Sequence, residues 1–274
     1  MTVLTDADLY RRGAETLLAS WEEYARGATG AAVQRSPGVA IAVFPNAPER
    51  AVYNNALLER DLAAAVRADA LDAMEAAYAA AGVPCFAAWV HESDEAMRGD
   101  LTRRGYTPDE STRAMGMALD DIRLPRPEIE LGPPDWLEYL RIIGVPPGFL
   151  SGADRAAFHV LVARLGGENV ATAMAFDFGS DCGIYNVTTL ERARRRGLGT
   201  ALTAVHVHDA LARGCQTASL QSTGMAERVY AAVGFRDLGR IFEYVPQTTP
   251  AGEFSLSAAT SRPAHRRDRA GVWL

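Results

Sequence analysis

The stretch ERARRRGLGT, at residues 191–200, places four arginines and two glycines directly after the apolar stretch GIYNVTTL, at residues 183–190. The branched and aromatic residues of the apolar stretch predict a buried strand. The residues after Gly197 are typical of a helix with one apolar face, because apolar side chains recur at Leu198, Ala201, Leu202 and Val205. The arginines and glycines therefore occupy the turn from a strand into a helix.

A turn of this kind suits a polyphosphate. The first amides of a helix lack internal partners and carry a partial positive charge, so several of them together stabilise a bound phosphate. Gly197 and Gly199 lack the Cβ atoms that would hold an anion away from the backbone, and arginines beside them add charge and fork-shaped donors. Taken alone, the short pattern favours a plainer interpretation, a solvated basic helix start with flexible glycines.

Composition restricts the class of protein. The chain has 274 residues and a net charge of −6, which argues against nucleic-acid binding by the chain as a whole. It contains no lysine, so a lysine-dependent phosphate loop is excluded. The three cysteines are odd in number and far apart, which fits a reducing compartment. Neither a signal peptide nor a long apolar span is evident, so we expect a cytoplasmic protein without membrane contact.

Periodicity along the chain predicts alternating helices and strands. We expect helices over residues 5–26, 67–82, 93–105, 135–143, 153–165, 198–214 and 224–234. We expect strands over residues 38–45, 50–58, 85–91, 111–119, 169–178, 182–190, 217–222 and 235–245.

A proline-rich stretch divides this series. It predicts a first domain at 1–120, a linker at 121–134 and a second domain at 135–246. The polar remainder, 247–274, is expected to be largely disordered.

The two halves resemble each other. AVYNNALLER at 51–60 aligns with GIYNVTTLER at 183–192, sharing Tyr–Asn and Leu–Glu–Arg at matched positions. We interpret this as duplication of one α/β unit, with chance similarity between two ordinary strand–helix units as the alternative.

A second motif lies downstream. In VYAAVGF, at residues 229–235, Tyr230 precedes a Gly–Phe pair on a predicted short helix. Together with Arg-x-x-Gly-x-Gly at 194–199 and the preceding YNVTT, this resembles the acyl-CoA-binding signature of the GNAT superfamily of N-acetyltransferases. The resemblance covers roughly residues 129–246. It implies an α/β (α+β) fold of two tandem GNAT-like domains, each with a mixed, largely antiparallel sheet flanked by helices.

The first half resembles the same fold without its chemistry. No glycine pair follows YNNALLER, and Leu101 stands where Tyr230 would be expected. The resemblance is therefore to tandem GNAT proteins with a degenerate N-terminal repeat.

The resemblance also implies a site. The diphosphate of acetyl-CoA would rest on the turn, the pantetheine arm would run beside the strand, and an amide near Val187 would polarise the thioester carbonyl. The residues implied in binding are Val187, Thr188, Thr189, Arg194, Arg195, Arg196, Gly197, Leu198, Gly199, Thr200 and Ser222. Tyr230 would protonate the leaving thiolate; from its position on an apolar face alone, a core tyrosine is the simpler interpretation.

The general base is left unassigned. Glu243 and Asp177 are candidates because they lie on predicted strands, and a water relay is an equal alternative. His206 and His208, two apart on a helix, face different directions, so we predict no metal. Trp136 and the loop 144–152 are expected to shape the acceptor pocket.

The function implied is transfer of an acyl group, most simply acetyl, to a small-molecule amine or a peptide N-terminus. The alternatives are a CoA-binding sensor or scaffold without catalysis and a mycothiol-synthase-like acetyltransferase. Nucleic-acid binding through the arginines is disfavoured by the negative net charge. The acceptor, the acyl chain and the formation of a homodimer are left open.

Overall fold

The structure is a computed structural model that describes residues 4–46, 53–145 and 152–247. Its α-helices are α1 (Asp6–Arg26), α2 (Ala64–Ala81), α3 (Glu95–Arg103), α4 (Trp136–Ile143), α5 (Leu198–Arg213) and α6 (Glu227–Val233). Its strands are β1 (Ala32–Ser36), β2 (Val39–Val43), β3 (Asn55–Leu58), β4 (Ala87–His91), β5 (Tyr106–Ala118), β6 (Phe158–Leu165), β7 (Glu168–Phe178), β8 (Asp181–Thr189), β9 (Thr217–Ser222) and β10 (Arg236–Pro246).

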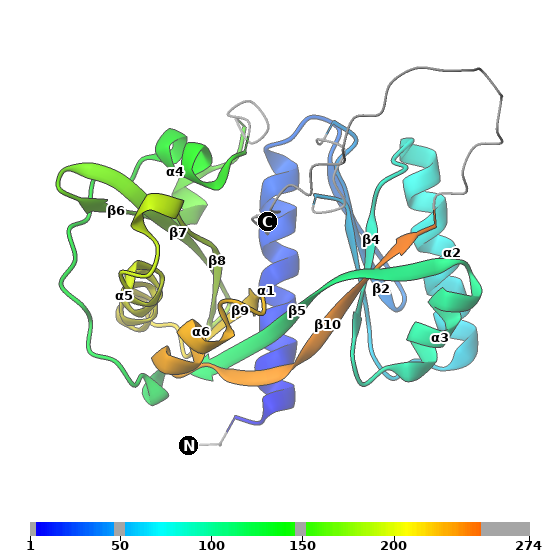
Figure 1. The fold of residues 1–274 in the computed structure, drawn as a ribbon. Helices are drawn as coiled ribbons and strands as arrows, with labels where there is room; N and C mark the ends of the chain where they lie inside the picture. Colours follow the sequence, from blue (N-terminus) through cyan, green and yellow to red (C-terminus); the bar gives the residue numbers. More distant parts are fainter. Residues whose placement is uncertain (1–3, 47–52, 146–151, 248–274) are drawn as a thin grey trace, which may run out of the picture.

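One continuous sheet organises both halves of the chain. It has ten strands in the order β1-β2-β3-β4-β10-β5-β9-β8-β7-β6, and Figure 1 shows the long strands β5 and β10 crossing its middle side by side. All neighbouring pairs are antiparallel except β3 with β4 and β8 with β9. The mixed, mostly antiparallel sheet flanked by helices confirms the fold class expected from the sequence.

The middle of the sheet joins the two halves. β10, from the end of the chain, lies between β4 and β5, and β5, from the first half, lies between β10 and β9. When five is subtracted from the numbers of strands β6 to β10, the order becomes 1-2-3-4-5-5-4-3-2-1, which is the same from either end. The sheet therefore does not separate at residues 121–134, where the sequence predicts a linker.

Helix α1 covers the centre of the sheet on one face. It starts with a capping box in which Thr5 and Asp8 exchange side-chain-to-backbone hydrogen bonds of 3.1 and 3.0 Å. The helix lies close to β9, because a Cβ atom added at Gly13 would come within 2.7 Å of the Ser219 side chain. Only glycine at this position permits so close an approach.

The two faces of the sheet carry different helices. Along β7, Met174 and Phe176 belong to an apolar cluster with α1 and α4, whereas the alternate residues Ala173 and Ala175 pack in clusters with α5 or α6. This alternation follows from the two-residue period of a strand. Helices α1 and α4 therefore lie on one face of the second half, and α5 and α6 lie on the other.

One predicted helix is wrong. Residues 153–165 form a short 3-10 helix, Arg155–Ala157, followed by strand β6. Alanine, leucine and arginine favour a helix in this stretch, but Phe158, Val160 and Val162 are buried at alternate positions. Pairing with β7 and burial of that face outweigh the local propensity.

The other predicted elements have counterparts in the described residues, and β1 is an additional strand. Its pattern is polar, with two exposed and two half-buried residues around Gln34, so it lacks the apolar run that identifies buried strands. The tail 248–274 and residues 146–151 of the predicted acceptor loop lie outside the described residues.

Candidate acyl-CoA site

Strands β8 and β9 separate in the middle of the second half. They pair in parallel only at Asp181–Thr217, Cys182–Ala218 and Gly183–Ser219. Beyond these pairs both strands continue, β8 to Thr189 and β9 to Ser222. The backbone groups that face the opening are thus available to an extended ligand, which can pair with them as an added strand does.

A bulge in β8 lies at this opening. The register with β7 shifts between Thr172 and Met174, so that Ala173 alone faces both Asn186 and Val187. Asn186 has a φ of +55°, a left-handed conformation that asparagine tolerates better than most residues. Such a bulge turns the local backbone out of the regular hydrogen-bond ladder. It includes Val187, whose amide is expected from the sequence to polarise a thioester carbonyl.

The side chain of Asn186 fixes this bulge from the α1 face. Its Nδ2 atom donates a 2.7 Å hydrogen bond to the Tyr139 hydroxyl of α4. Both side chains are buried, at 8% and 0% exposure, and burial raises the pKa of Tyr139. Tyr139 therefore stays protonated, and α4 is connected directly to the bulge.

The turn before α5 contains two residues with a left-handed backbone. Arg195 and Gly197 have φ values of +62° and +77°, and Gly197 is the N-cap of the helix. The Nε atom of Arg194 donates to the Thr189 carbonyl at 3.2 Å, which ties the turn to the end of β8. The side chains of Arg194, Arg195 and Arg196 are exposed.

The amides of this turn form an uncovered cradle. Within the described part of the chain, no backbone amide from Arg195 to Thr200 donates to another backbone group. A Cβ atom at Gly197 would meet nothing within 4 Å, and one at Gly199 would meet only Val187 Cγ1 at 3.7 Å and Val229 Cγ1 at 4.0 Å. These residues fit a diphosphate, and Gly199 lies beside Val187 of β8 and Val229 of α6.

Tyr230 lies on α6, directly after Val229. Its ring is 93% buried and packs edge-on against Phe235, in the apolar cluster that also contacts Val187. Burial raises its pKa to about 12, so the phenol is protonated at neutral pH and can donate a proton.

The remaining implied residues lie around the same opening. Val187, Thr188 and Thr189 form the half-buried end of β8, and Leu198 and Thr200 begin α5. Ser222 is buried at the end of β9, and its hydroxyl donates to the Thr223 carbonyl at 2.9 Å. The proton of the Ser222 hydroxyl is therefore already engaged in a hydrogen bond within the protein.

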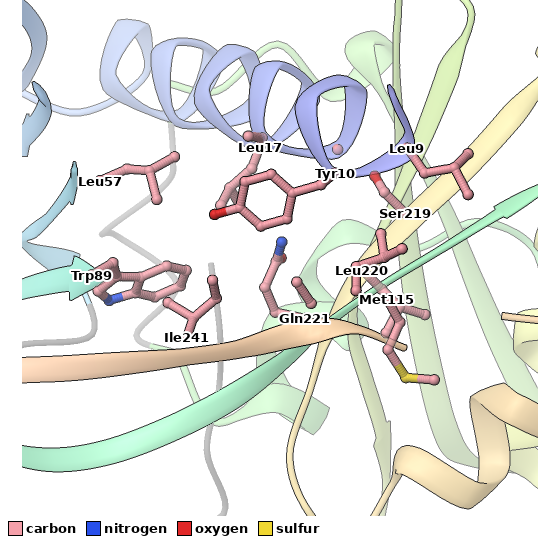
Figure 2. A pocket seen from close by; sticks show the side chains of 14 residues that line it. Leu9, Tyr10, Leu17, Leu57, Trp89, Met115, Ser219, Leu220, Gln221 and Ile241 are labelled. Atoms are coloured by element: carbon pink, nitrogen blue, oxygen red, sulfur yellow. The ribbon is translucent and has the colours of Figure 1, made fainter. Parts of the chain in front are cut away.

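A pocket lies on the opposite face of the sheet, beneath α1 (Figure 2). Its floor comes from the central strands, including Gln221, which lies two residues beyond the last β9 residue that pairs with β8. No local pattern in the sequence identifies this pocket, because its lining is assembled from six elements that are distant along the chain.

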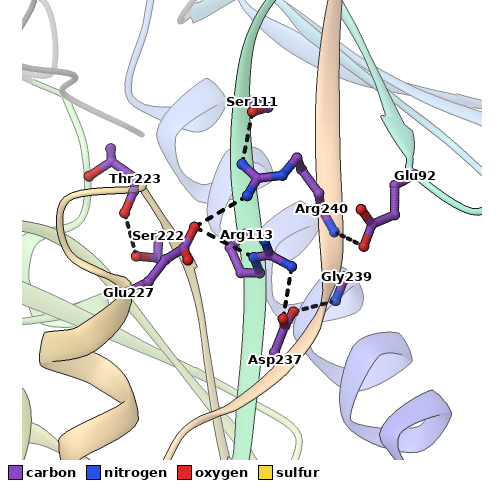
Figure 3. Close-up of polar contacts among 9 residues, drawn as sticks. All are labelled: Glu92, Ser111, Arg113, Ser222, Thr223, Glu227, Asp237, Gly239 and Arg240. Atoms are coloured by element: carbon purple, nitrogen blue, oxygen red, sulfur yellow. Dashed lines mark hydrogen bonds and ion pairs between the residues drawn. The ribbon is translucent and has the colours of Figure 1, made fainter.

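An ion-pair network holds the start of α6. Arg113 of β5 contacts Glu227 at 3.5 Å and Asp237 at 2.8 Å, and Arg240 of β10 contacts Glu227 at 3.6 Å. Figure 3 shows these side chains meeting beside the end of β9. Residues from both halves thus fix the helix that carries Tyr230.

The two carboxylates considered as bases lie elsewhere. Asp177 is at the far end of the β7–β8 hairpin, in an ion pair with Arg213 at 2.6 Å. Burial alone would raise its pKa, but the hydrogen bonds from Arg213, His159 and Cys182 together with the Arg213 charge lower it. Glu243 is on β10, which is separated from β8 by β5 and β9. Neither carboxylate is placed to accept a proton from an amine that lies near Val187.

The other polar residues singled out by the sequence have structural partners or are buried. His208 contacts the Leu124 carbonyl at 2.9 Å, and burial lowers the pKa of His206 to about 4. Trp136 is buried against Phe158 and does not line the pocket under α1. Cys215 is a buried free thiol.

In residues 4–46, 53–145 and 152–247, no group of metal-binding side chains is assembled. In the same residues, no helix is suited to cross a membrane.

The corresponding turn in the first half lacks the glycine pair. A Cβ atom at Gly38 would lie 2.7 Å from Leu62 Cδ1, so the Leu62 side chain, just before α2, packs against the turn between β1 and β2. Leu101, at the position aligned with Tyr230, is fully buried on α3.

Comparison with known families agrees with this geometry. Residues 119–235 match the model of the acetyltransferase (GNAT) family. This region is similar to the GNAT family of acetyltransferases. The match contains the open turn, the β8 bulge and Tyr230, whereas no curated protein matches the sequence.

Several solved structures share the fold of both halves. A GCN5-related N-acetyltransferase from Kribbella flavida aligns with a TM-score of 0.66 at 17% identity, over 86% of this chain and 96% of its own. One from Sphaerobacter thermophilus aligns with a TM-score of 0.56 at 16% identity, over 88% and 93%. A conserved protein of unknown function from Staphylococcus epidermidis gives 0.53 at 13%, over 77% and 91%. At such identities the likeness concerns the fold.

Proposed function

We propose that this protein is an acetyl-CoA-dependent N-acetyltransferase that acetylates a primary amine by direct transfer. The observation that supports this most strongly is the unobstructed amide cradle at Arg195–Thr200, with Gly199 beside Val187 and the helix of Tyr230. Arg194, Arg195 and Arg196 would hold the diphosphate together with these amides. When bound, acetyl-CoA supplies the acetyl thioester.

In the proposed reaction, the bulge of β8 presents a backbone amide near Val187 to the thioester oxygen, which stabilises negative charge there. The nitrogen lone pair of the acceptor forms the new C–N bond, and the C–S bond breaks. Tyr230 gives its proton to the departing sulfur. The surplus nitrogen proton goes to water, and solvent returns a proton to the Tyr230 oxygen, so the products are the amide and the free thiol.

The acidity of Tyr230 sets the cost of its step. Its pKa of about 12 exceeds the value of about 8.5 for an ordinary thiol, so transfer to the thiolate costs about 5 kcal/mol at about 1.4 kcal/mol per unit. The same buried surroundings raise the pKa of the thiol and reduce this cost. Water as the acid, with a pKa of about 15.7, is a poorer donor.

A non-catalytic CoA-binding module is the second candidate. It is favoured by the positions of Asp177 and Glu243, both of which lie away from Val187. Thiol release from acetyl-CoA, measured across a panel of primary amines, separates the two. Amine-dependent release supports the transferase, whereas tight CoA binding without release for any amine supports the sensor.

We also propose that the first half, 1–120, is a degenerate repeat of the second, 135–246, joined by residues 121–134. The symmetric strand order and the YNNALLER–YNVTTLER match support this. The absence of a glycine pair before α2 accounts for one phosphate site rather than two.

A further inference from the structure

Helix α6 is too short to hold its own position. It spans the seven residues Glu227–Val233, and no side chain caps its N-terminus, whereas isolated helices shorter than about 12–15 residues are marginal in water. Its last turn is fixed by the segment that follows β5, because the Arg123 amide donates to the Val233 carbonyl at 3.1 Å. Its first turn is fixed separately, through the ion pairs of Glu227.

Glu227 is held by arginines of two central strands. Its Oε1 atom lies 3.5 Å from Arg113 Nε and 3.6 Å from Arg240 Nη2, and Figure 3 shows the carboxylate joined to both guanidinium groups. Arg113 of β5 pairs with Arg240 of β10 on one side and with Ser222, the last residue of β9, on the other. The anchor therefore stands where the chain leaves β9 toward α6.

A second carboxylate orients the Arg113 side chain. Its Nη1 atom donates to Asp237 Oδ2 at 2.8 Å, and the other oxygen of Asp237 accepts a 2.9 Å hydrogen bond from the Gly239 amide. The Arg113 side chain is only 19% exposed, and salt screens partly buried charges less than charges at the surface. Arg113 therefore faces Glu227 in a fixed direction.

The strands that carry the arginines are held without these ion pairs. β5 is already hydrogen-bonded to β10 along one edge and to β9 along the other. Of the four charged residues joined by these contacts, only Glu227 lies outside the strands; the others are Arg113, Asp237 and Arg240. What the ion pairs add to the fold is a fixed start for α6.

Tyr230 depends on α6 for its position. It follows Glu227 by three residues, so the two side chains are neighbours on the surface of the helix. Its ring packs edge-on against Phe235, but within the described residues no hydrogen bond holds its hydroxyl. A rotation or shift of the first turn of α6 therefore moves the phenol oxygen directly.

We propose that Arg113 is a positioning residue for the transfer: through Glu227 it fixes the orientation of α6 and so places the Tyr230 hydroxyl. The inference rests on the proposed function, in which Tyr230 is the proton donor. Arg113 belongs to β5, a strand of the first half. The half that lacks the glycine pair thus contributes to the chemistry of the other half.

The test measures thiol release by the full chain from acetyl-CoA with 2-phenylethylamine, spermidine or an alanyl peptide with a free N-terminus. The amine that the wild type acetylates fastest is used for all variants. Because a misplacement of about 1 Å can cost about 100-fold in rate, we expect Arg113→Ala to lower kcat about tenfold or more. The dissociation constant for acetyl-CoA should change less than twofold, since the phosphate turn belongs to α5.

Arg67→Ala is the matched control. The Arg67 side chain is 15% exposed and pairs with Asp100 at 2.6 Å, which joins α2 to α3, the helix of the first half that aligns with α6. We expect this variant to lose similar stability in urea unfolding and to keep the wild-type kcat. An equal loss of kcat in Arg67→Ala and Arg113→Ala would overturn the inference.

Double variants separate positioning of Tyr230 from general weakening of the fold. In the Tyr230→Phe background, Arg113→Ala should change kcat less than twofold. Glu227→Gln should lower kcat at least as much as Arg113→Ala, and adding Arg113→Ala to Glu227→Gln should change kcat less than twofold. The inference is wrong if Arg113→Ala keeps the wild-type kcat, or if it lowers kcat by the same factor with and without the Tyr230 hydroxyl.

Amide hydrogen exchange over residues 227–233 tests the anchor without any turnover. We expect exchange to be faster in Arg113→Ala and in Glu227→Gln than in the wild type and in Arg67→Ala. Unchanged exchange in both α6 variants would overturn the inference. Absence of thiol release by the wild type with every amine, beside the expected change in exchange, would instead overturn the proposed function.

Discussion

Asn186 of β8 and Tyr139 of α4 are joined by a buried hydrogen bond of 2.7 Å at the one point where β8 leaves its regular register with β7. Asn186 has a left-handed backbone there, and its side chain points away from the face that carries α5. A helix on one face of the sheet thus fixes the backbone that faces the proposed thioester. Positioning residues of this kind act through the conformation they hold rather than by touching the substrate.

Two substitutions of Asn186 therefore separate the effect of its backbone conformation from the effect of its hydrogen bond. Asn186→Gly keeps the left-handed backbone but loses the bond, so we expect a loss of about 1 kcal/mol in unfolding free energy. Asn186→Val adds a backbone penalty of about 1–2 kcal/mol and should also lower kcat with little change in acetyl-CoA affinity. Urea unfolding and steady-state kinetics measure these effects. Equal stability and equal kcat for the two variants would show that the bulge needs no left-handed residue.

Tyr230→Phe tests the proton donor. Because only the hydroxyl is removed from a buried ring, we expect kcat to fall about 100-fold or more, while the dissociation constant for acetyl-CoA changes less than twofold. Stopped assays and calorimetric titration measure the two quantities. A variant with wild-type turnover would remove Tyr230 from the mechanism.

The pH dependence of turnover gives a separate check on Tyr230. Since burial raises its pKa to about 12, the phenol remains protonated from pH 6 to well above pH 10. We expect no alkaline decrease in kcat that depends on Tyr230 across that range. A decrease centred near pH 8–9 that disappears in Tyr230→Phe would contradict this assignment.

Glu243 should affect stability in a pH-dependent way. It is 95% buried, and burial first, then the charges of Glu110 and Asp109, raise its pKa to about 8. The folded state thus binds the proton more tightly than the unfolded state, whose carboxyl has a pKa near 4.3. This favourable contribution is complete below about pH 4 and is lost as pH rises to about 8.

Glu243→Gln removes that titration. We expect the variant to gain stability relative to the wild type as pH rises from about 4.5 to 8, with a constant difference above pH 8. Thermal unfolding at a series of pH values gives the difference. A difference that is flat over this range would place the pKa of Glu243 near its ordinary value.

Much of this fold can be read from local patterns in the sequence. The turn at 191–200 is predictable because its arginines, glycines and apolar helix stripe all lie within a few residues of one another. Helix α2 likewise ends at Gly82, whose φ of +64° suits the glycine expected there.

Features that depend on distant contacts are harder to predict. Strand β6 has helix-favouring residues and becomes a strand because β7 is available to pair with it. The exchange of β5 and β10 between the halves, and the pocket beneath α1, depend on strands that are far apart in the sequence. Neither has a local signature, so composition and periodicity cannot report them.

The most direct test of the central claim is calorimetric titration of acetyl-CoA into Gly197→Val and its matched control Gly214→Val. The two glycines cap opposite ends of α5, have φ values of +77° and +98°, and are each free of neighbours within 4 Å of an added Cβ atom. Both variants should therefore lose similar stability. If the diphosphate rests on the amides of Arg195–Thr200, acetyl-CoA binding weakens at least tenfold in Gly197→Val and is retained in Gly214→Val; equal affinity in the two variants would contradict the account.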